Sequence, residues 1–136
     1  MQVRDGMSKL VLTVGPGHTL REAARLMADR GVGAAVVIDP DGEGPAIVTE
    51  RDMLISLGAG EDPDTEKVAE HLTSDVVYAA PDWPLEQAAA EMVRGRFRHL
   101  IVTEGADVVG VLSVRDVVRC WTDDGASCEV DAPAAA

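Results

Sequence analysis

The stretch Ala46-Ile-Val-Thr-Glu-Arg-Asp-Met53 returns later in the chain as Gly110-Val-Leu-Ser-Val-Arg-Asp-Val117. Each copy ends an apolar run with a hydroxyl residue, which is followed by Arg-Asp after one intervening residue. Outward from these copies, a constant offset of 65 residues aligns Val3 with Val68 and Pro16 with Pro81, and one residue is dropped in the loop before Thr49 meets Ser113. An internal repeat suggests units that cannot bury their apolar faces alone. The sequence therefore predicts two copies of one unit that together form one compact module.

Composition supports a globular protein. The chain has 136 residues, of which 46% are hydrophobic and 26% charged, and this suits one compact domain. Its formal net charge of -12 argues against a general nucleic-acid binder, because the chain repels polyanions. The longest apolar run, Ala34–Ile38, is far shorter than the roughly 20 residues of a membrane helix. The polar start has no signal-peptide core, so we expect no membrane association and a cytoplasmic location.

The positions of the cysteines and histidines in the sequence match neither a disulfide framework nor a metal-binding motif. Cys120 and Cys128 both lie at or beyond the end of the second copy, which favours two reduced thiols over a disulfide framework. The three histidines are scattered without metal-ligand spacing, so no metal site is expected. The stretch 122–136 is rich in acidic residues, Gly and Ala without an apolar period, and is predicted to be a flexible tail.

Each copy contains an amphipathic helix. The stripe Leu20, Ala23, Ala24 and Met27 has helical spacing, and Thr19 with Glu22 matches a capping box at its start. Gly31 is expected to end this helix. The second copy repeats the stripe behind a proline that the first turn tolerates, with residues Pro84, Leu85, Ala88, Ala89 and Met92.

Strands and a second helix follow in each copy. The apolar runs Ala34–Ile38 and Ala46–Val48 predict two strands joined by a turn, and Asp52–Leu57 continues as a helix. Leu10–Val14 precedes the first helix as an extended piece. The second copy has equivalent segments at Leu100–Val102, Val108–Leu112, Asp116–Trp121 and Asp75–Tyr78. The predicted fold class is α+β (α/β-like), with β-α-β-β-α repeats over residues 1–60 and 61–121.

The repeated Thr/Ser-x-Arg-Asp motif has chemistry suited to a nucleotide. It lies where a strand meets a helix, and the free N–H groups of a first helical turn attract phosphate oxygens. Thr49 can hydrogen-bond a phosphate, Asp52 can accept from ribose hydroxyls, and Arg51 adds positive charge. The equivalent residues of the second copy are Ser113, Asp116 and Arg115. The alternative is that hydroxyl and aspartate form a capping box that only closes the helix.

With these motifs, the sequence resembles the cystathionine-β-synthase (CBS) domain pair, or Bateman module, over about residues 3–121. Met7-Ser8 with Val11-Leu12-Thr13-Val14 is similar to the opening signature of that family. Arg98-His99-Leu100-Ile101-Val102 is similar to its Arg-His-Leu-Pro-Val strand entry. Ala46 stands where the family often has Gly, so the resemblance is closer at the site around Asp116.

The resemblance implies two clefts related by a pseudo-twofold axis, with an adenine nucleotide or adenosyl ligand between the repeats. The expected ligand is AMP, ADP or ATP, with S-adenosylmethionine or NAD as alternatives. Backbone groups near Thr13-Val14 and Val77-Tyr78 would contact adenine. Arg98 and His99 would meet phosphates, although cations at the end of a helix also serve simply to relieve its dipole. The family further implies a homodimer.

Three classes of function follow from these patterns. The leading one is a stand-alone regulatory module that binds an adenosyl ligand and signals to an unidentified effector protein. The alternative is a dimerising structural or interaction module without a nucleotide ligand. An enzyme is poorly supported, because the sequence has no P-loop, no G-x-S-x-G elbow and no base beside the repeated serine. No catalytic residue or required cofactor is predicted.

Overall fold

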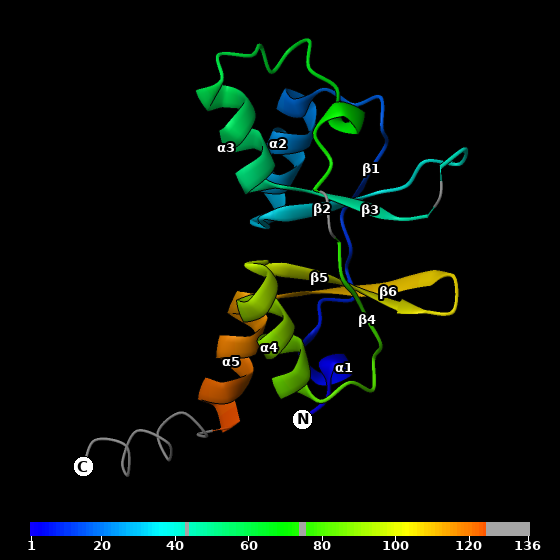
Figure 1. Ribbon diagram of the computed structural model, residues 1–136, viewed down its shortest axis with the longest axis vertical. Helices are drawn as coiled ribbons and strands as arrows, with labels where there is room; N and C mark the ends of the chain where they lie inside the picture. The colour runs from blue at the N-terminus through cyan, green and yellow to red at the C-terminus, as the bar shows by residue number, and fades with distance from the viewer. Residues whose placement is uncertain (43, 74–75, 125–136) are drawn as a thin grey trace, which may run out of the picture. The chain divides into compact units, whose positions relative to one another are not determined.

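The computed structural model describes residues 1–42, 44–73 and 76–124, and it divides into two compact units (Figure 1). One unit is Leu10–Val76, here called the Thr49 unit. The other joins Met1–Lys9 to the chain from Val77 onward and is called the Ser113 unit. Each contains helices and a mixed sheet, which confirms the predicted α+β class.

The Thr49 unit is a three-stranded sheet covered by helices. Strand β2 (Ala34–Val37) is central, parallel to β1 (Thr13–Val14) and antiparallel to β3 (Ala46–Thr49). Helices α2 (Leu20–Arg30) and α3 (Glu50–Gly58) lie on one face of this sheet (Figure 1). The short 3-10 helix η1 (Val68–Glu70) completes the unit.

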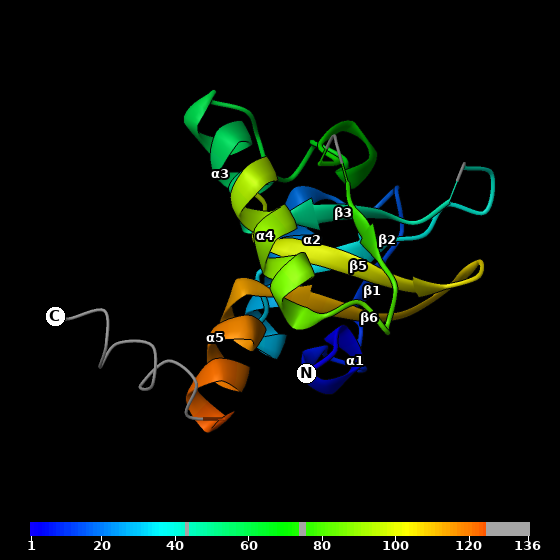
Figure 2. The ribbon, with the colours of Figure 1, turned by 60° about the horizontal axis from the view of Figure 1, so that its bottom comes forward.

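The Ser113 unit repeats this plan. Its sheet has the order β4 (Tyr78–Ala79), β5 (His99–Glu104) and β6 (Asp107–Ser113), with β4 parallel and β6 antiparallel to β5 (Figure 2). Two further elements, α4 (Leu85–Gly95) and α5 (Val114–Asp124), pack beside each other on one face. The N-terminal helix α1 (Val3–Gly6) belongs to this unit.

The predicted boundaries of α2 are confirmed by its capping bonds. Glu22 N–H donates to Thr19 Oγ1 at 3.1 Å, and Thr19 N–H donates to Glu22 Oε1 at 2.9 Å. The bond from Thr19 N–H lowers the pKa of Glu22. At the other end Gly31 adopts the left-handed conformation, with φ of 66°. Arg96 has the equivalent place after α4 with φ of 60°, a conformation that is unfavourable for a residue with a Cβ.

Each unit has its own apolar core, and the helical stripes supply it as predicted. Within the stripes, the buried residues are Leu20, Ala23, Met27, Leu85, Ala88 and Met92. In the Thr49 unit they pack with strand residues such as Val14, Val37 and Val48. In the Ser113 unit they pack with residues such as Leu100, Val102 and Leu112. Each sheet therefore packs against a helix, α2 or α4, that lies in sequence between its first and second strands.

The opening segments of the two repeats are exchanged between the units. Val3 is fully buried in the Ser113 unit, whereas Val68, its counterpart in the second copy, is fully buried in the Thr49 unit. Ser8 N–H donates to Val111 O at 2.9 Å, and Val111 N–H donates to Ser8 O at 3.1 Å. Each packed unit thus combines the body of one repeat with the opening segment of the other.

The C-terminal helix extends into the predicted tail. Helix α5 continues through Asp124, so Thr122 is helical, whereas 125–136, with Cys128, lie outside the described residues. Cys120 is a free, buried cysteine of the Ser113 core. Part of the second extended piece, Asp75, also lies outside the described residues. In the part of the chain that is described, no helix is long and apolar enough to cross a membrane.

We predict that Val3→Ala lowers the free energy of unfolding by about 2 kcal/mol, because it removes buried methyl groups from the Ser113 core. Urea unfolding followed by circular dichroism measures the change. The exposed Lys9, at the end of the same opening segment, provides the control Lys9→Ala, which should change stability by less than about 0.5 kcal/mol. Equal stability of Val3→Ala and wild type would contradict the packing of this segment.

Candidate functional site

The first repeated motif forms the junction between β3 and α3. Thr49 is the N-cap of α3, in extended backbone. Its hydroxyl accepts from Asp52 N–H at 3.4 Å, and its own N–H donates to Asp52 Oδ2 at 2.8 Å. The Thr49 hydroxyl also lies 3.0 Å from Asp52 Oδ2. This junction is a capping box, which confirms the structural role that the spacing suggested.

The second motif makes the same turn between β6 and α5. Ser113 N–H donates to Asp116 Oδ2 at 2.8 Å, and Asp116 N–H donates to Ser113 Oγ at 3.0 Å. Both aspartates are partly buried at the start of a helix. Each capping bond uses only one carboxylate oxygen, Oδ2, so capping leaves the other oxygen of each aspartate for a further donor.

Asp52 has an additional partner that the sequence analysis missed. The hydroxyl of Thr73 donates to Asp52 Oδ2, and Thr73 N–H donates to Ile47 O at 2.9 Å. Among the described residues no hydrogen bond reaches Asp52 Oδ1. The repeat alignment places Leu72-Thr73 opposite Met7-Ser8 and so identifies Thr73 as part of the opening segment of the second repeat. The alignment does not indicate that this segment packs in the Thr49 unit, next to Asp52.

Asp116 has a different partner. Arg119, one turn further along α5, donates to Asp116 Oδ1 at 3.1 Å and to Gly6 O at 3.0 Å. The hydrogen bond to Asp116 raises the pKa of Arg119 above its ordinary value, so the guanidinium stays charged. The carboxylate of Asp116 is therefore neutralised in part, whereas that of Asp52 has no cationic partner among the described residues.

The strand beside each junction also differs between the copies. His99 pairs with Ser113 across β5 and β6, and Val114 N–H donates to Arg98 O at 2.9 Å. In the Thr49 unit the equivalent neighbours of Thr49 are Gly33 and Ala34. A Cβ at Gly33 would meet the Glu50 carboxylate group at 3.1 Å. One junction thus has Arg and His beside it, and the other has small residues and a carboxylate.

The remaining predicted contacts lie on the same two sheets. Thr13 and Val14 form edge strand β1, with Thr13 exposed and Val14 O accepting from Ile38 N–H at 3.3 Å. In the Ser113 unit, Val77 O accepts from Ile101 N–H at 3.3 Å, and Tyr78 is 44% exposed. These pairs are separated from the capped junctions by the central strand of each sheet.

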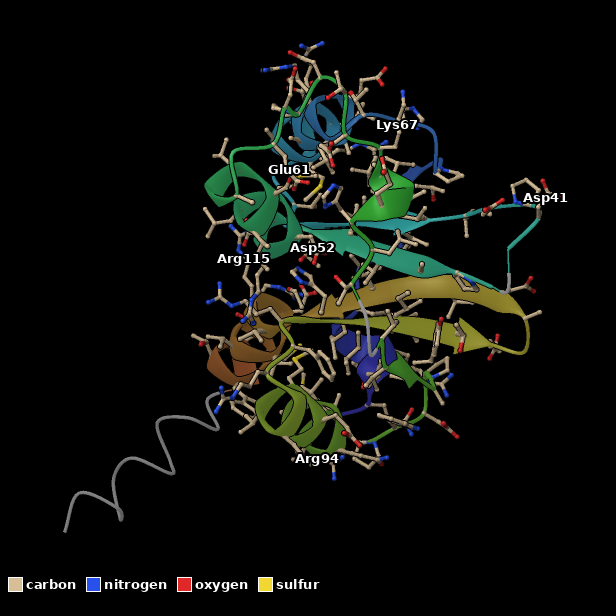
Figure 3. All side chains as sticks on the ribbon, turned by 45° about the horizontal axis from the view of Figure 1, so that its top comes forward. Asp41, Asp52, Glu61, Lys67, Arg94 and Arg115 are labelled. Carbon is tan, nitrogen blue, oxygen red and sulfur yellow. The ribbon has the colours of Figure 1, made fainter. Side chains whose placement is uncertain are left out.

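Charged side chains around the junctions are mostly exposed. Arg51 and Arg115 occupy the first turns of α3 and α5 and are both exposed, and Figure 3 labels Arg115 at the start of α5. Arg94 forms an ion pair with Glu91 on α4, which raises the pKa of the arginine. Arg94 therefore belongs to the surface of the helix, and Arg98 is the arginine that the strand pairing brings beside Ser113.

The family model and the similar proteins all point to the same family. The model of the CBS domain matches residues 2–58 and 68–123. The CBS domain-containing protein YhcV of Bacillus subtilis is 33% identical over 116 residues, which are 85% of this chain and 81% of that protein.

Solved structures agree with this match. A CBS domain protein from Pyrobaculum aerophilum, complexed with AMP, is 29% identical with a TM-score of 0.77, over 85% of this chain and 89% of that one. The CBS domain pair of protein MJ0100, in complex with 5′-methylthioadenosine and S-adenosyl-L-methionine, has a TM-score of 0.81 over 91% of this chain and 98% of its own. At 22% identity that second structure is similar in fold alone.

We predict that Thr73→Val destabilises the protein by about 1.5–3 kcal/mol, since the variant keeps the shape of threonine but withdraws a hydrogen bond from a partly buried carboxylate. Thr73→Ser, which retains the hydroxyl, should lose less than half as much. Urea unfolding of both variants measures the difference. Equal losses would indicate that the hydroxyl of Thr73 contributes nothing to the junction.

Proposed function

This chain belongs to the CBS domain family, with two copies of the domain, and from that premise we propose that it is a non-catalytic regulatory module that binds an adenine nucleotide. The observation that carries the proposal is the pair of capped junctions, at which a hydroxyl and a carboxylate are fixed at the start of a helix. The bound nucleotide shifts the conformation of the module, and the shift is transmitted to a partner protein.

The fixed carboxylates suit ribose recognition. A carboxylate oxygen accepts hydrogen bonds from the two adjacent ribose hydroxyls, and the capping bonds hold the acceptor in position before the ligand arrives. At Asp52 the oxygen Oδ1 is open to this role among the described contacts. At Asp116 the same oxygen has Arg119 as a partner and keeps a second lone pair for a ribose hydroxyl.

The phosphate is assigned to the Ser113 unit. Arg98 and His99 lie beside Ser113, where a cation and the N-terminal end of α5 attract the same anion. Glu50 beside Gly33 disfavours a phosphate at the equivalent place in the Thr49 unit. The proposed ligand of the Ser113 unit is therefore AMP, ADP or ATP, and an uncharged adenosyl group suits the Thr49 unit better.

The similar protein from Pyrobaculum aerophilum supports AMP as the first ligand to test, because it was solved with AMP. S-Adenosylmethionine and NAD share the adenosine group and belong in the same panel. A regulatory role needs binding without turnover, so the nucleotide should be recovered unchanged after incubation with the protein.

We predict that AMP raises the melting temperature of the wild type, since a ligand at 100 times its Kd stabilises the folded state by about 2.7 kcal/mol. Asp116→Asn keeps an oxygen for the cap but removes the charge, and should weaken AMP binding by roughly tenfold or more. Isothermal titration calorimetry with AMP, ADP, ATP, S-adenosylmethionine and NAD measures the affinities.

Two controls accompany this measurement. Asp29→Asn, an exposed aspartate on α2, should leave all affinities unchanged. Arg98→Gln should weaken AMP while leaving adenosine unaffected, because only AMP carries a phosphate. If no adenosyl compound binds the wild type, or if Asp29→Asn weakens AMP as much as Asp116→Asn does, the proposed site is wrong.

Exposed apolar side chains favour a second function, self-association. Leu54, Ile55 and Leu57 on α3 are 67%, 62% and 65% exposed, and on α5 Val118 is 52% exposed. Concentrated apolar surface on a helix typically marks an interaction site. We therefore propose a homodimer that uses these helices, which is compatible with ligand binding and would be the main activity if no adenosyl ligand binds.

We predict that Leu54→Glu with Leu57→Glu converts the dimer to a monomer, because burying two carboxylates in an apolar interface is strongly unfavourable. Light scattering after size-exclusion chromatography measures the mass. Val93→Glu on α4, where the valine is 81% exposed, is the matched control and should leave the mass unchanged. A monomeric wild type at the same concentration would show that these helices do not associate.

A further inference from the structure

Three potential metal ligands come together in the Thr49 unit, away from the capped junction. One ligand atom from each of Glu61, Glu66 and His71 lies within 4.8 Å of the other two. His71 Nε2 is 2.7 Å from Glu66 Oε1, and the side chains of these two residues are only 14% and 25% exposed. Glu61 is exposed and leaves one side of the cluster open to solvent. The histidines show no metal-ligand spacing in the sequence, and it is the fold that brings His71 close to Glu61 and Glu66.

The backbone holds these residues in place from two directions. Glu66 accepts from Leu20 N–H at 3.0 Å through its carbonyl, and His71 N–H donates to Val68 O at 3.0 Å. Glu61 follows the end of α3 (Figure 3), and its N–H donates to Ser56 O at 3.2 Å. The cluster therefore joins the end of α3 to the chain on both sides of η1.

A buried hydroxyl orients one of the carboxylates. Ser56 is only 2% exposed, and it is a buried polar residue of α3. Its hydroxyl donates to Glu61 Oε1 at 2.8 Å. A hydrogen bond to one oxygen of a ligating carboxylate leaves the other oxygen for the ion, as in outer-shell contacts of metal sites. Ser56 thus gives the exposed Glu61 a fixed side-chain direction.

The charge of the cluster is unbalanced. Two carboxylates lie next to one imidazole, and among the described residues no lysine or arginine forms an ion pair with Glu61 or Glu66. Arg21, on the neighbouring helix α2, is instead paired with Asp64. With a neutral imidazole, the two carboxylates carry the charge that one divalent cation neutralises.

We propose that Glu61, Glu66 and His71 bind a divalent transition-metal ion of the Zn²⁺ class. An imidazole nitrogen with two carboxylate oxygens suits Zn²⁺ and its first-row neighbours, whereas Ca²⁺ and Mg²⁺ take oxygen ligands alone. Bonds of about 2.0–2.2 Å would draw the ligand atoms closer together, a change that side-chain rotation provides. Water fills the open position on the side of Glu61.

The bound ion would cross-link two segments that also build the capped junction. Helix α3 begins at the Thr49–Asp52 cap, and the chain that follows η1 leads from His71 to Thr73, whose hydroxyl donates to Asp52. The ion therefore stabilises the Thr49 unit when it is bound. The metal site does not depend on nucleotide binding, and it is tested without nucleotide.

Titration of the chelator-treated full chain with Zn²⁺ by calorimetry tests the site. The expected result is one ion bound per chain, with Glu61→Gln and His71→Gln each weakening Zn²⁺ by roughly tenfold or more. Glu70→Gln removes the same charge from an exposed glutamate of η1 and should leave the affinity within about twofold of wild type. Co²⁺ in place of Zn²⁺ should give visible absorption bands that Glu61→Gln diminishes.

His71 is partly buried, so its variant can lose binding by unfolding, and circular dichroism separates the two causes. Glu61 is exposed, and Gln retains an oxygen acceptor for Ser56, so Glu61→Gln is the decisive variant. Zn²⁺ affinity equal to wild type in Glu61→Gln overturns the proposal. An equal loss in Glu70→Gln also overturns it, because general negative charge would then explain binding.

Discussion

The hydrogen bonds between a hydroxyl residue and the aspartate that follows it fix both strand-to-helix junctions. Thr49 and Ser113 are each the last residue of a strand, and each caps the helix that follows. The carboxylate of the aspartate three residues later accepts a hydrogen bond from the backbone N–H of the same Thr or Ser. Because the helix start is fixed, α3 and α5 lie over the same sheet faces as α2 and α4 (Figure 1). The same bonds immobilise the carboxylates that the proposed ligand would meet, so stability and the proposed binding use the same side chains, with Oδ2 in the cap and Oδ1 left for the ligand.

Local patterns in the sequence predicted most of the fold. The stripe from Leu20 to Met27 and the Thr19 cap involve neighbours along the chain, and the structure has the helix where they indicate it. Helices α1 and η1 were not predicted, because such short segments contain no measurable period. The partners Thr73 of Asp52 and Arg119 of Gly6 were also missed. They depend on packing between segments distant in sequence, which a repeat alignment does not encode.

The two copies retain one backbone and differ in the charge beside it. Arg98 and His99 accompany Ser113, whereas Gly33 and Ala34 accompany Thr49, with Glu50 close to Gly33. Motif matching treated the two sites as near equivalents and preferred Asp116, because Ala46 departs from the usual glycine. The contacts distinguish them on other grounds: the carboxylate of Asp116 is shared with a guanidinium, and that of Asp52 is not. A duplicated scaffold thereby presents two different surfaces for recognition.

The exchange of opening segments explains why the repeats occur in tandem. A single repeat brings an apolar residue, Val3 or Val68, that completes the core of the other body. Two such repeats on separate chains would have to meet in solution before either core was complete, and their folding would depend on protein concentration. Covalent linkage makes the exchange intramolecular, at an effective concentration that the linker sets. Because both repeats are in one chain, the folding of each half does not depend on protein concentration.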